Sequence, residues 1–273
     1  MFLTKIFLHK KVLTEKLKKL FGNTSVTVGL LLTAAGVVLV SGYFLQPDLS
    51  ETADPFELGE YYFNAYDTPD GKYDLKLARQ YYTKAIEEGS ENPMVWYQLG
   101  RIDFLEGNYS GALYKFDKQI ALYGEQVPSV YYMRGLTYGY KARKSGDALD
   151  WRKAEENFLK HLEDKPESPW TRTDLSWVYF SQGKFAEMVP LLEEGLSFEP
   201  QNPWLLNMYG LSLMNTGRRE EARAQFEQAL EFASYLDEES WGRTYPGNDP
   251  AAWKQGLAEF QSLIKKNLEL TSK

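Results

Sequence analysis

The stretch WYQLGRIDFLEGNYSGALYKF, residues 96–116, contains the spacing that decides the fold. A glycine is followed twelve residues later by an alanine, and four residues after that by a phenylalanine. The same offsets occur twice, in the sets Gly100, Ala112, Phe116 and Gly210, Ala222, Phe226. Small residues at a contact allow two antiparallel helices to approach closely. Because one such pair cannot bury its apolar face alone, the recurrence predicts helix pairs stacked in an array.

Five units of this kind follow one another, at about 52–92, 93–126, 128–167, 169–202 and 203–236. Their shared pattern is a large apolar residue, then Leu-Gly, then Ala-x-x-x-Phe/Tyr-x-x-Ala, and it resembles the tetratricopeptide repeat (TPR). The first unit, with YYTKAIEEG at residues 81–89, also resembles the Sel1-like repeat, whose hairpin loop is longer. The resemblance implies an all-α fold, a right-handed α-solenoid of about five TPR helix pairs over residues 56–236.

Two of the units are longer than the others. In the first and third units the glycine and the alanine are nineteen residues apart, so each unit carries seven extra residues between its helices. Gly71 and Ser145-Gly146 are the turn residues expected there, because glycine and serine favour turns between helical segments.

A separate segment follows the repeats. Residues 237–248 show no helical periodicity and are expected to be irregular. Asp249-Pro250 then reads as a helix cap followed by proline in the first turn. Beyond it, apolar residues recur at helical spacing: Trp253, Leu257, Phe260, Ile264 and Leu268. Residues 237–273 are therefore predicted to be a linker and a C-terminal capping helix that covers the last repeat.

Near the N-terminus, the twenty residues 26–45 include no charged side chain. A helix of that length spans roughly 30 Å, the hydrocarbon thickness of a bilayer. We therefore expect one transmembrane helix at residues 23–46, in contact with the lipid bilayer through residues 26–45, and a linker at 47–55. A cleaved secretory signal is the alternative, although its apolar core usually has about 7–15 residues.

The charge on the two sides of this segment is asymmetric. Residues 1–22 hold six lysines and one glutamate, interspersed with apolar residues as in a basic amphipathic segment. Lysine and arginine accumulate on the cytoplasmic side of membrane helices. The sequence thus predicts a single-pass protein of the cell membrane, with a cytoplasmic N-terminus and an extracytoplasmic TPR domain.

The composition argues against several classes of function. The net charge is −7 for the whole chain and −12 for residues 23–273, so we expect no nucleic acid as a partner. There is no cysteine, and the two histidines, His9 and His161, fall on opposite sides of the predicted membrane helix. No catalytic triad, paired-histidine metal site or phosphate-binding loop is visible. We expect that the protein is not an enzyme and uses no cofactor, metal or small-molecule substrate.

The resemblance to TPR proteins implies that the first helix of each pair lines an inner groove that binds other proteins. Carried over by position, the peptide-binding residues are Tyr97, Arg101, Phe104, Tyr132, Tyr140, Trp170, Trp177 and Trp204. Many are aromatic, as are the anchors at protein interfaces. The alternative is that these residues belong to the core. Phe56 and Glu60 stand where some family members bind a peptide's C-terminal carboxylate with Lys and Asn, which argues against that ligand.

The function expected from these features is protein–protein interaction, as a scaffold or adaptor in an extracytoplasmic envelope assembly, secretion or translocation complex. Two alternatives stay open. A holdase-like chaperone would bind apolar segments of many unfolded chains, and a regulatory subunit would copurify with a membrane enzyme.

The topology can be tested by proteolysis. Protease added outside spheroplasts should digest the repeats and leave residues 1–22 protected, because the lysines hold the N-terminus in the cytoplasm. Protection of residues 60–273 would contradict this orientation. A mature N-terminus near Gly42 would identify a cleaved signal in place of an anchor.

Overall fold

The computed structural model describes residues 53–64, 73–127, 129–244 and 249–272. The chain divides into two units, Met1–Ala53 and Asp54–Lys273, and the fold that follows is that of the second unit. Its elements are α4 (Pro55–Phe63), α5 (Leu75–Glu87), α6 (Met94–Leu105), α7 (Tyr109–Tyr123), the 3₁₀ turn η1 (Gly124–Gln126), α8 (Ser129–Ser145), α9 (Ala148–Asp164), α10 (Pro169–Ser181), α11 (Phe185–Phe198), α12 (Pro203–Asn215), α13 (Arg219–Ser234), α14 (Glu238–Thr244), η2 (Pro250–Ala252) and α15 (Trp253–Leu270). No strand occurs within these described ranges.

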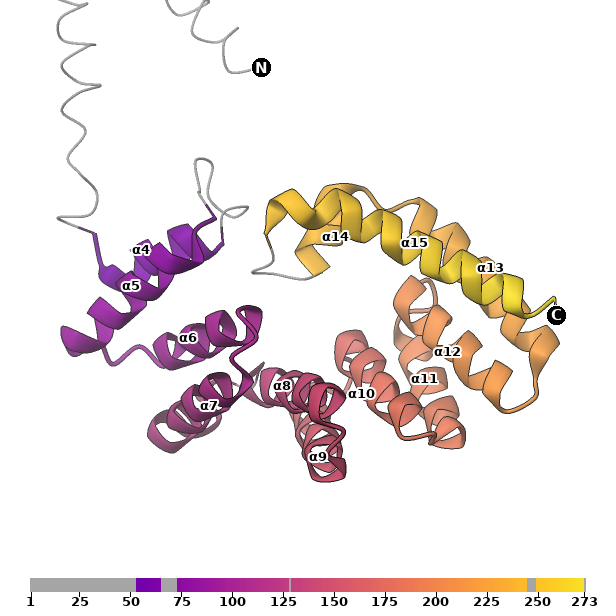
Figure 1. Ribbon diagram of the computed structural model, residues 1–273, viewed down its shortest axis with the longest axis horizontal. Coiled ribbons are helices and arrows are strands. Elements are labelled where there is room, and N and C mark those ends of the chain that lie inside the picture. The colour runs from indigo at the N-terminus through magenta and orange to yellow at the C-terminus, as the bar shows by residue number, and fades with distance from the viewer. Residues whose placement is uncertain (1–52, 65–72, 128, 245–248, 273) are drawn as a thin grey trace, which may run out of the picture. The chain divides into compact units, whose positions relative to one another are not determined.

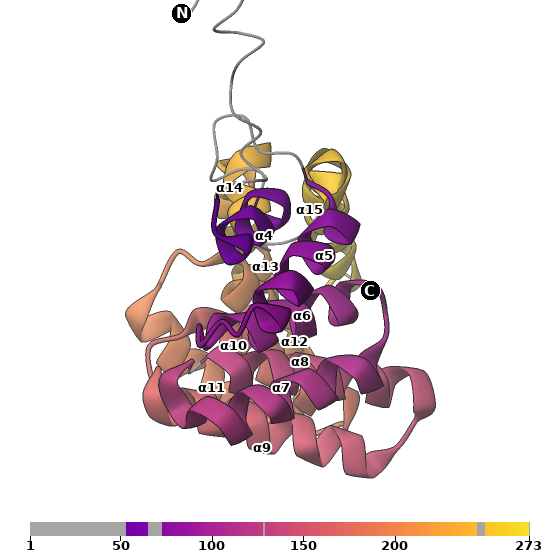
Figure 2. The same ribbon diagram turned by 90° about the vertical axis from the view of Figure 1, so that its left-hand side faces the viewer.

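The helices pack as consecutive pairs. α4 packs on α5, α6 on α7, α8 on α9, α10 on α11 and α12 on α13, and each pair also contacts the next pair along the chain (Figures 1 and 2). The predicted all-α array of helix pairs is therefore confirmed for the described part of the chain. The predicted turn at Ser145-Gly146 is also present, since Gly146 has a φ of 75° between α8 and α9. The extra residues of this unit lengthen both helices of the pair.

The contact inside each pair is the one that the glycine spacing predicts. A Cβ atom added to Gly100 would lie 2.4 Å from Cε1 of Phe116, so the ring rests on the helix backbone. The same contact joins Gly59 to Tyr82, Gly135 to Phe158 and Gly210 to Phe226. In the fourth pair a buried serine, Ser176, stands in place of the glycine, and the smaller Leu192 stands in place of the ring.

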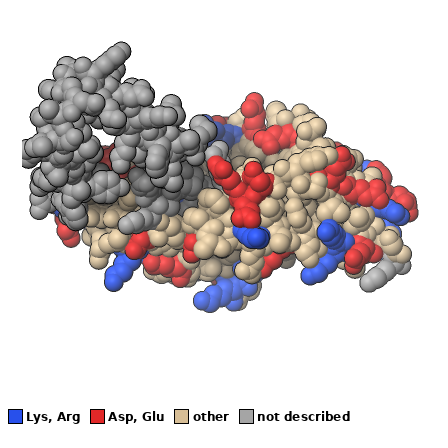
Figure 3. All heavy atoms as spheres, turned by 90° about the horizontal axis from the view of Figure 1, so that it is seen from above, with Lys and Arg blue, Asp and Glu red and all other residues tan. Residues whose placement is uncertain are grey.

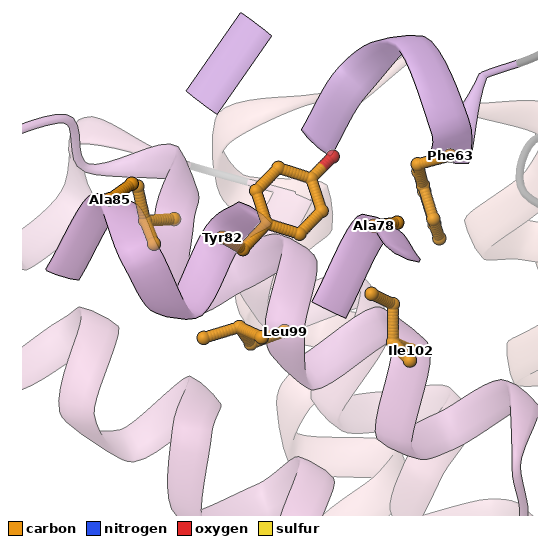
Figure 4. Packing of buried hydrophobic residues seen from close by; sticks show 7 residues of the cluster. Phe63, Ala78, Tyr82, Ala85, Leu99 and Ile102 are labelled. Carbon is orange, nitrogen blue, oxygen red and sulfur yellow. The ribbon is translucent and has the colours of Figure 1, made fainter. Parts of the chain in front are cut away.

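Figure 4 shows how the second helix of one pair fills the space toward the next pair. The buried ring of Tyr82 on α5 lies among apolar side chains of α4, α5 and α6: Phe63, Ala78, Ala85, Leu99 and Ile102. Trp96, expected from its position in the repeat to fill such a space, is only partly buried. Its neighbours Val95 and Tyr97 enter the core instead, at 1% and 7% exposure.

Polar residues followed by proline start four of the helical segments. The carboxylate of Asp54 accepts from the backbone N–H of Phe56 at 2.7 Å, and Pro55 follows as the first helical residue. The same arrangement occurs at Ser168-Pro169, Asn202-Pro203 and Asp249-Pro250. Proline costs little there, because the first amides of a helix have no partner within the helix. The cap predicted at Asp249 is thus confirmed, although its first turn is the 3₁₀ turn η2.

The C-terminal segment covers the last pair and contains one more helix than expected. α15 packs on α13, where Ile264 is buried against Leu206, Ala229 and Ala233. The stretch expected to be irregular includes α14, whose Gly242 lies against the ring of Trp253. Trp253 therefore packs against α14, whereas Phe260 and Ile264 lie on the last repeat as predicted.

In the part of the chain that the structure describes, no helix combines the length and the apolar character needed to cross a bilayer. The predicted membrane helix at 23–46, the basic segment 1–22 and the linker as far as residue 52 lie outside that part. So does the loop around Gly71, and the Sel1-like character of the first unit stays a prediction.

One buried position departs from the pattern of small residues. Gln119 on α7 is fully buried at the position that Ala85 and Ala229 occupy in other pairs, and both its amide atoms lack a hydrogen-bond partner among the described residues. Gln98 on α6 is equally buried, yet its amide donates to Glu60 at 2.5 Å and accepts from Arg101 at 2.8 Å. A buried polar group without a partner costs about 1–3 kcal/mol.

The two glutamines form a matched test of this packing. Gln119→Met keeps the side-chain volume and removes the unpaired amide, so it should raise the free energy of unfolding by about 1–3 kcal/mol. Gln98→Met should lower it, because Glu60 and Arg101 lose a partner. Chemical denaturation measures both. A loss of stability in the Gln119 variant would show that the amide is satisfied in solution.

Candidate binding surface on the first helices

The first helices of neighbouring pairs lie side by side, with α6 against α8, α8 against α10 and α10 against α12. Three partly exposed rings connect them, and we call Phe104, Tyr140 and Trp177 the aromatic row. Phe104 on α6 meets Tyr140 on α8 edge-on, with centroids 5.3 Å apart. Tyr140 in turn lies 5.4 Å from Trp177 on α10. The row therefore runs across three consecutive pairs.

The rings of the row are held in place from several sides. The Trp177 ring rests on the α8 backbone, since a Cβ added to Gly139 would lie 2.6 Å from its Cζ3 atom. Trp151 on α9 supports the same ring at 5.4 Å. The Arg143 guanidinium lies 4.7 Å from the Tyr140 centroid, a cation–π distance. Such support fixes the rings before any partner arrives, which lowers the entropic cost of binding.

A carboxylate that the sequence did not single out lies beside the row. Asp174 is partly exposed on α10, and its Oδ2 accepts a hydrogen bond from the Tyr132 hydroxyl at 2.7 Å. Burial raises the pKa of Asp174 to about 7, and the Tyr132 hydrogen bond opposes this shift. Burial is also the main cause of the raised pKa of Tyr140, to which the Asp174 charge adds. Asp174 forms no ion pair with any described residue.

The structure divides the eight residues predicted from the sequence. Tyr97 and Trp204 are buried, at 7% and 8% exposure, and belong to the packing between pairs. Tyr97 lies 6.0 Å from Phe116, and burial raises its pKa. The other six are partly exposed: Arg101, Phe104, Tyr132, Tyr140, Trp170 and Trp177. Among these six, the structure brings together the aromatic row and Tyr132, which Asp174 links to α10.

Two predicted tryptophans form a second aromatic cluster. Trp170 on α10 meets Trp204 on α12 edge-on at 5.1 Å, and Trp204 stacks on Phe260 of α15 at 4.9 Å. An open pocket of about 430 Å³ lies beside them, lined also by Pro200, Pro203 and Leu236. Because Trp204 is sandwiched between two rings, its main role is to join α15 to the array.

Arg101 is engaged inside the protein. Its guanidinium donates to Gln98 at 2.8 Å and lies 4.4 Å from the Phe63 centroid. Gln98 in turn donates to Glu60, which also accepts from the Tyr82 hydroxyl at 2.6 Å. Burial and the Glu60 charge both raise the pKa of Tyr82, which therefore stays protonated. Arg101 thus ties α6 to α4.

The remaining charges do not point to a metal or to a polyanion. No group of three His, Cys, Asp or Glu side chains within the described ranges is arranged to hold a metal ion. On the face seen in Figure 3, acidic and basic side chains are interspersed among uncharged surface. The chemistry offered by the row is therefore apolar and aromatic contact, with one carboxylate at its edge.

These features define a TPR-like α-solenoid with an aromatic surface on its first helices. Residues 205–235 match the sequence model of the tetratricopeptide repeat, which corresponds to the fifth pair. No curated protein matches the chain in sequence. The match to a single repeat identifies that repeat, and the fold of the other pairs follows from the structure itself.

Solved structures share this fold at low sequence identity. A thermophilic TPR protein from Thermus thermophilus is 18% identical with a TM-score of 0.53, over 76% of this chain and 96% of that one. PilW, a type IV pilus biogenesis factor, is 14% identical with a TM-score of 0.53, over 80% and 97%. MamA is 20% identical with a TM-score of 0.51, over 59% and 90%. At such identities the likeness concerns the fold alone.

The titration of Asp174 tests the geometry of this surface. Nuclear magnetic resonance should find its carboxyl pKa near 7. Tyr132→Phe should raise it further, because the lost hydrogen bond stabilised the charged form. Tyr131→Phe, a control on the same helix, should leave it unchanged.

The same pKa determines whether the free energy of unfolding rises or falls with pH. Because Asp174 holds its proton more tightly in the folded chain than at its ordinary pKa of 3.8, its contribution to the free energy of unfolding should fall as pH rises from about 4 to about 7. A pKa near 4 would show that the carboxyl is well solvated and would contradict the arrangement described.

Proposed function

We propose that this protein is a membrane-anchored scaffold or adaptor that binds an apolar segment of another protein on the aromatic row. The observation that carries the proposal is that Phe104, Tyr140 and Trp177 form one continuous, preorganised and partly exposed surface across three repeats. Aromatic side chains supply a large share of the binding energy at protein interfaces. The proposal assigns binding, and no reaction, to this chain.

The proposed place of action is the extracytoplasmic side of the cell membrane. It rests on the uncharged segment at residues 26–45 and on the six lysines that precede it. An envelope assembly, secretion or translocation complex would use a scaffold in this place. The fold neighbour PilW is described as a pilus biogenesis factor, which is compatible with such a role and does not by itself assign it.

The choice of probes follows from the burial of the row. Tyr97 is unsuitable, since truncating a buried ring opens a cavity and costs roughly 3–5 kcal/mol of stability. Phe104 and Tyr140 are partly exposed, so they can be changed with less damage to the fold. Tyr114 on α7 is a matched control, because it is an aromatic residue with 58% exposure outside the row.

Site-specific photocrosslinking in intact membranes tests the proposal. A photoreactive phenylalanine at position 140 should give a discrete adduct with one partner, and the same group at position 114 should give none. Phe104→Glu should abolish the adduct at position 140, because a carboxylate would have to be desolvated against the partner. Its melting temperature should stay close to that of the parent.

The other outcomes discriminate the alternatives. Many weak adducts, increased when unfolded chains accumulate, would favour a holdase-like chaperone. An adduct with one membrane enzyme whose activity changes in the Phe104 variant would favour a regulatory subunit. Equal adducts from positions 140 and 114 would contradict a binding surface on the row.

A further inference from the structure

We propose that Asp174 anchors the ammonium group of a lysine side chain in the segment that binds the aromatic row. The inference rests on the proposed function, because it concerns the same surface. It goes further by naming the chemistry of the partner: an apolar segment that carries one lysine.

The proposed lysine contact is supported first by the hydrogen bonding of the Asp174 carboxylate. Its Oδ2 accepts from the Tyr132 hydroxyl, and within the described residues no other side chain hydrogen-bonds to either oxygen. A carboxylate that is partly withdrawn from water is stabilised by pairing with a cation. The two fully buried aspartates among the described residues are paired in this way: Asp103 with Arg79 and Lys115, and Asp150 with Lys141.

The position of Asp174 among aromatic rings also supports the lysine contact. On α10 it lies one turn after Trp170 and one turn before Trp177, so the three side chains share one helix face. Tyr132 and Tyr140 approach from α8. Aromatic faces attract cations at distances up to about 6 Å. A carboxylate beside aromatic rings is therefore a site for an organic cation attached to an apolar stem, as in lysine.

The hydrogen bond from Tyr132 favours lysine over arginine as the residue that contacts Asp174. Arginine binds a carboxylate best through two parallel hydrogen bonds to both oxygens. Here Oδ2 already accepts from Tyr132, so a bidentate arginine would have to share that oxygen with the hydroxyl, whereas Oδ1 accepts from no described side chain. An ammonium group acts as a point charge and needs only one oxygen.

The charged and titratable groups around Asp174 leave its carboxylate open to a cation from the partner. Arg143, at the end of α8, lies over the Tyr140 ring and forms no ion pair with Asp174. His161 on α9 bonds to Thr171 at 2.7 Å, and burial lowers its pKa, so it is neutral near pH 7. Burial raises the pKa of Tyr140, so it keeps its proton. No described neighbour neutralises the carboxylate.

The test begins with the full-length chain and a random peptide display library. Peptides selected by the parent, and not by the Phe104→Glu chain, should be enriched in lysine flanked by apolar residues. Selection with Asp174→Asn should keep the apolar residues and lose the lysine preference. Lys144→Gln, a charge variant at an exposed position of α8 outside the aromatic row and the proposed contact, should keep both.

Binding constants then separate the two proposals. A selected peptide should lose roughly ten- to hundredfold in affinity when its lysine is replaced by norleucine, and Asp174→Asn should lose the same factor without further loss on norleucine. Equal affinity of the lysine and norleucine peptides would overturn the anchor and leave the proposed function standing. Failure of the parent to select any peptide over the Phe104→Glu chain would overturn both.

The pH dependence gives a readout that a merely structural role of Asp174 would not move. Protonation removes the anchor's charge, so the parent should bind the lysine peptide about tenfold more weakly at about pH 6 than at about pH 8. The norleucine peptide and the Asp174→Asn chain should show no such change. A parent affinity independent of pH would contradict the anchor.

Discussion

The array depends on the distance between the two helices of each pair. That distance is set where a side chain of the second helix lies on the bare backbone of the first, as Phe116 does on Gly100. A Cβ atom at this point would overlap the ring, and the close packing of protein interiors leaves it no room to move. The fourth pair has Ser176 and Leu192 at the same two positions of the pattern, a larger residue on the first helix and a smaller one on the second, and both are buried.

This spacing also positions the surface on the first helices. α6 lies against α8 and α8 against α10, close enough for Phe104, Tyr140 and Trp177 to touch. Gly139 repeats the same principle between pairs, since its bare backbone seats the Trp177 ring. Stability and the geometry of the candidate site therefore share one cause.

The sequence predicted the helix pairs because the residues that build them recur at fixed offsets. It placed Trp96 in the core and Tyr97 on the surface, whereas the structure buries Tyr97 more deeply. Neighbouring positions on a helix between two pairs both face protein, so spacing alone cannot rank their burial. α14 was missed because contacts with the next helix, such as that of Gly242 with Trp253 of α15, support it. Asp174 was missed because its surroundings come from other helices. The signal that points to it is an acidic residue between two tryptophans, at positions 170, 174 and 177.

The last pair ends differently from the others, through α15. The side-chain amide of Asn267 donates to Asn207 at 2.9 Å in a buried position, and Phe260 stacks on Trp204. An apolar contact alone would let a helix slide along the repeat, but a buried hydrogen bond between two amides is satisfied in one register only. The edge of the last pair is therefore covered by α15 in a single register. The place that a sixth helix pair would fill is thus taken by a single helix of the same chain.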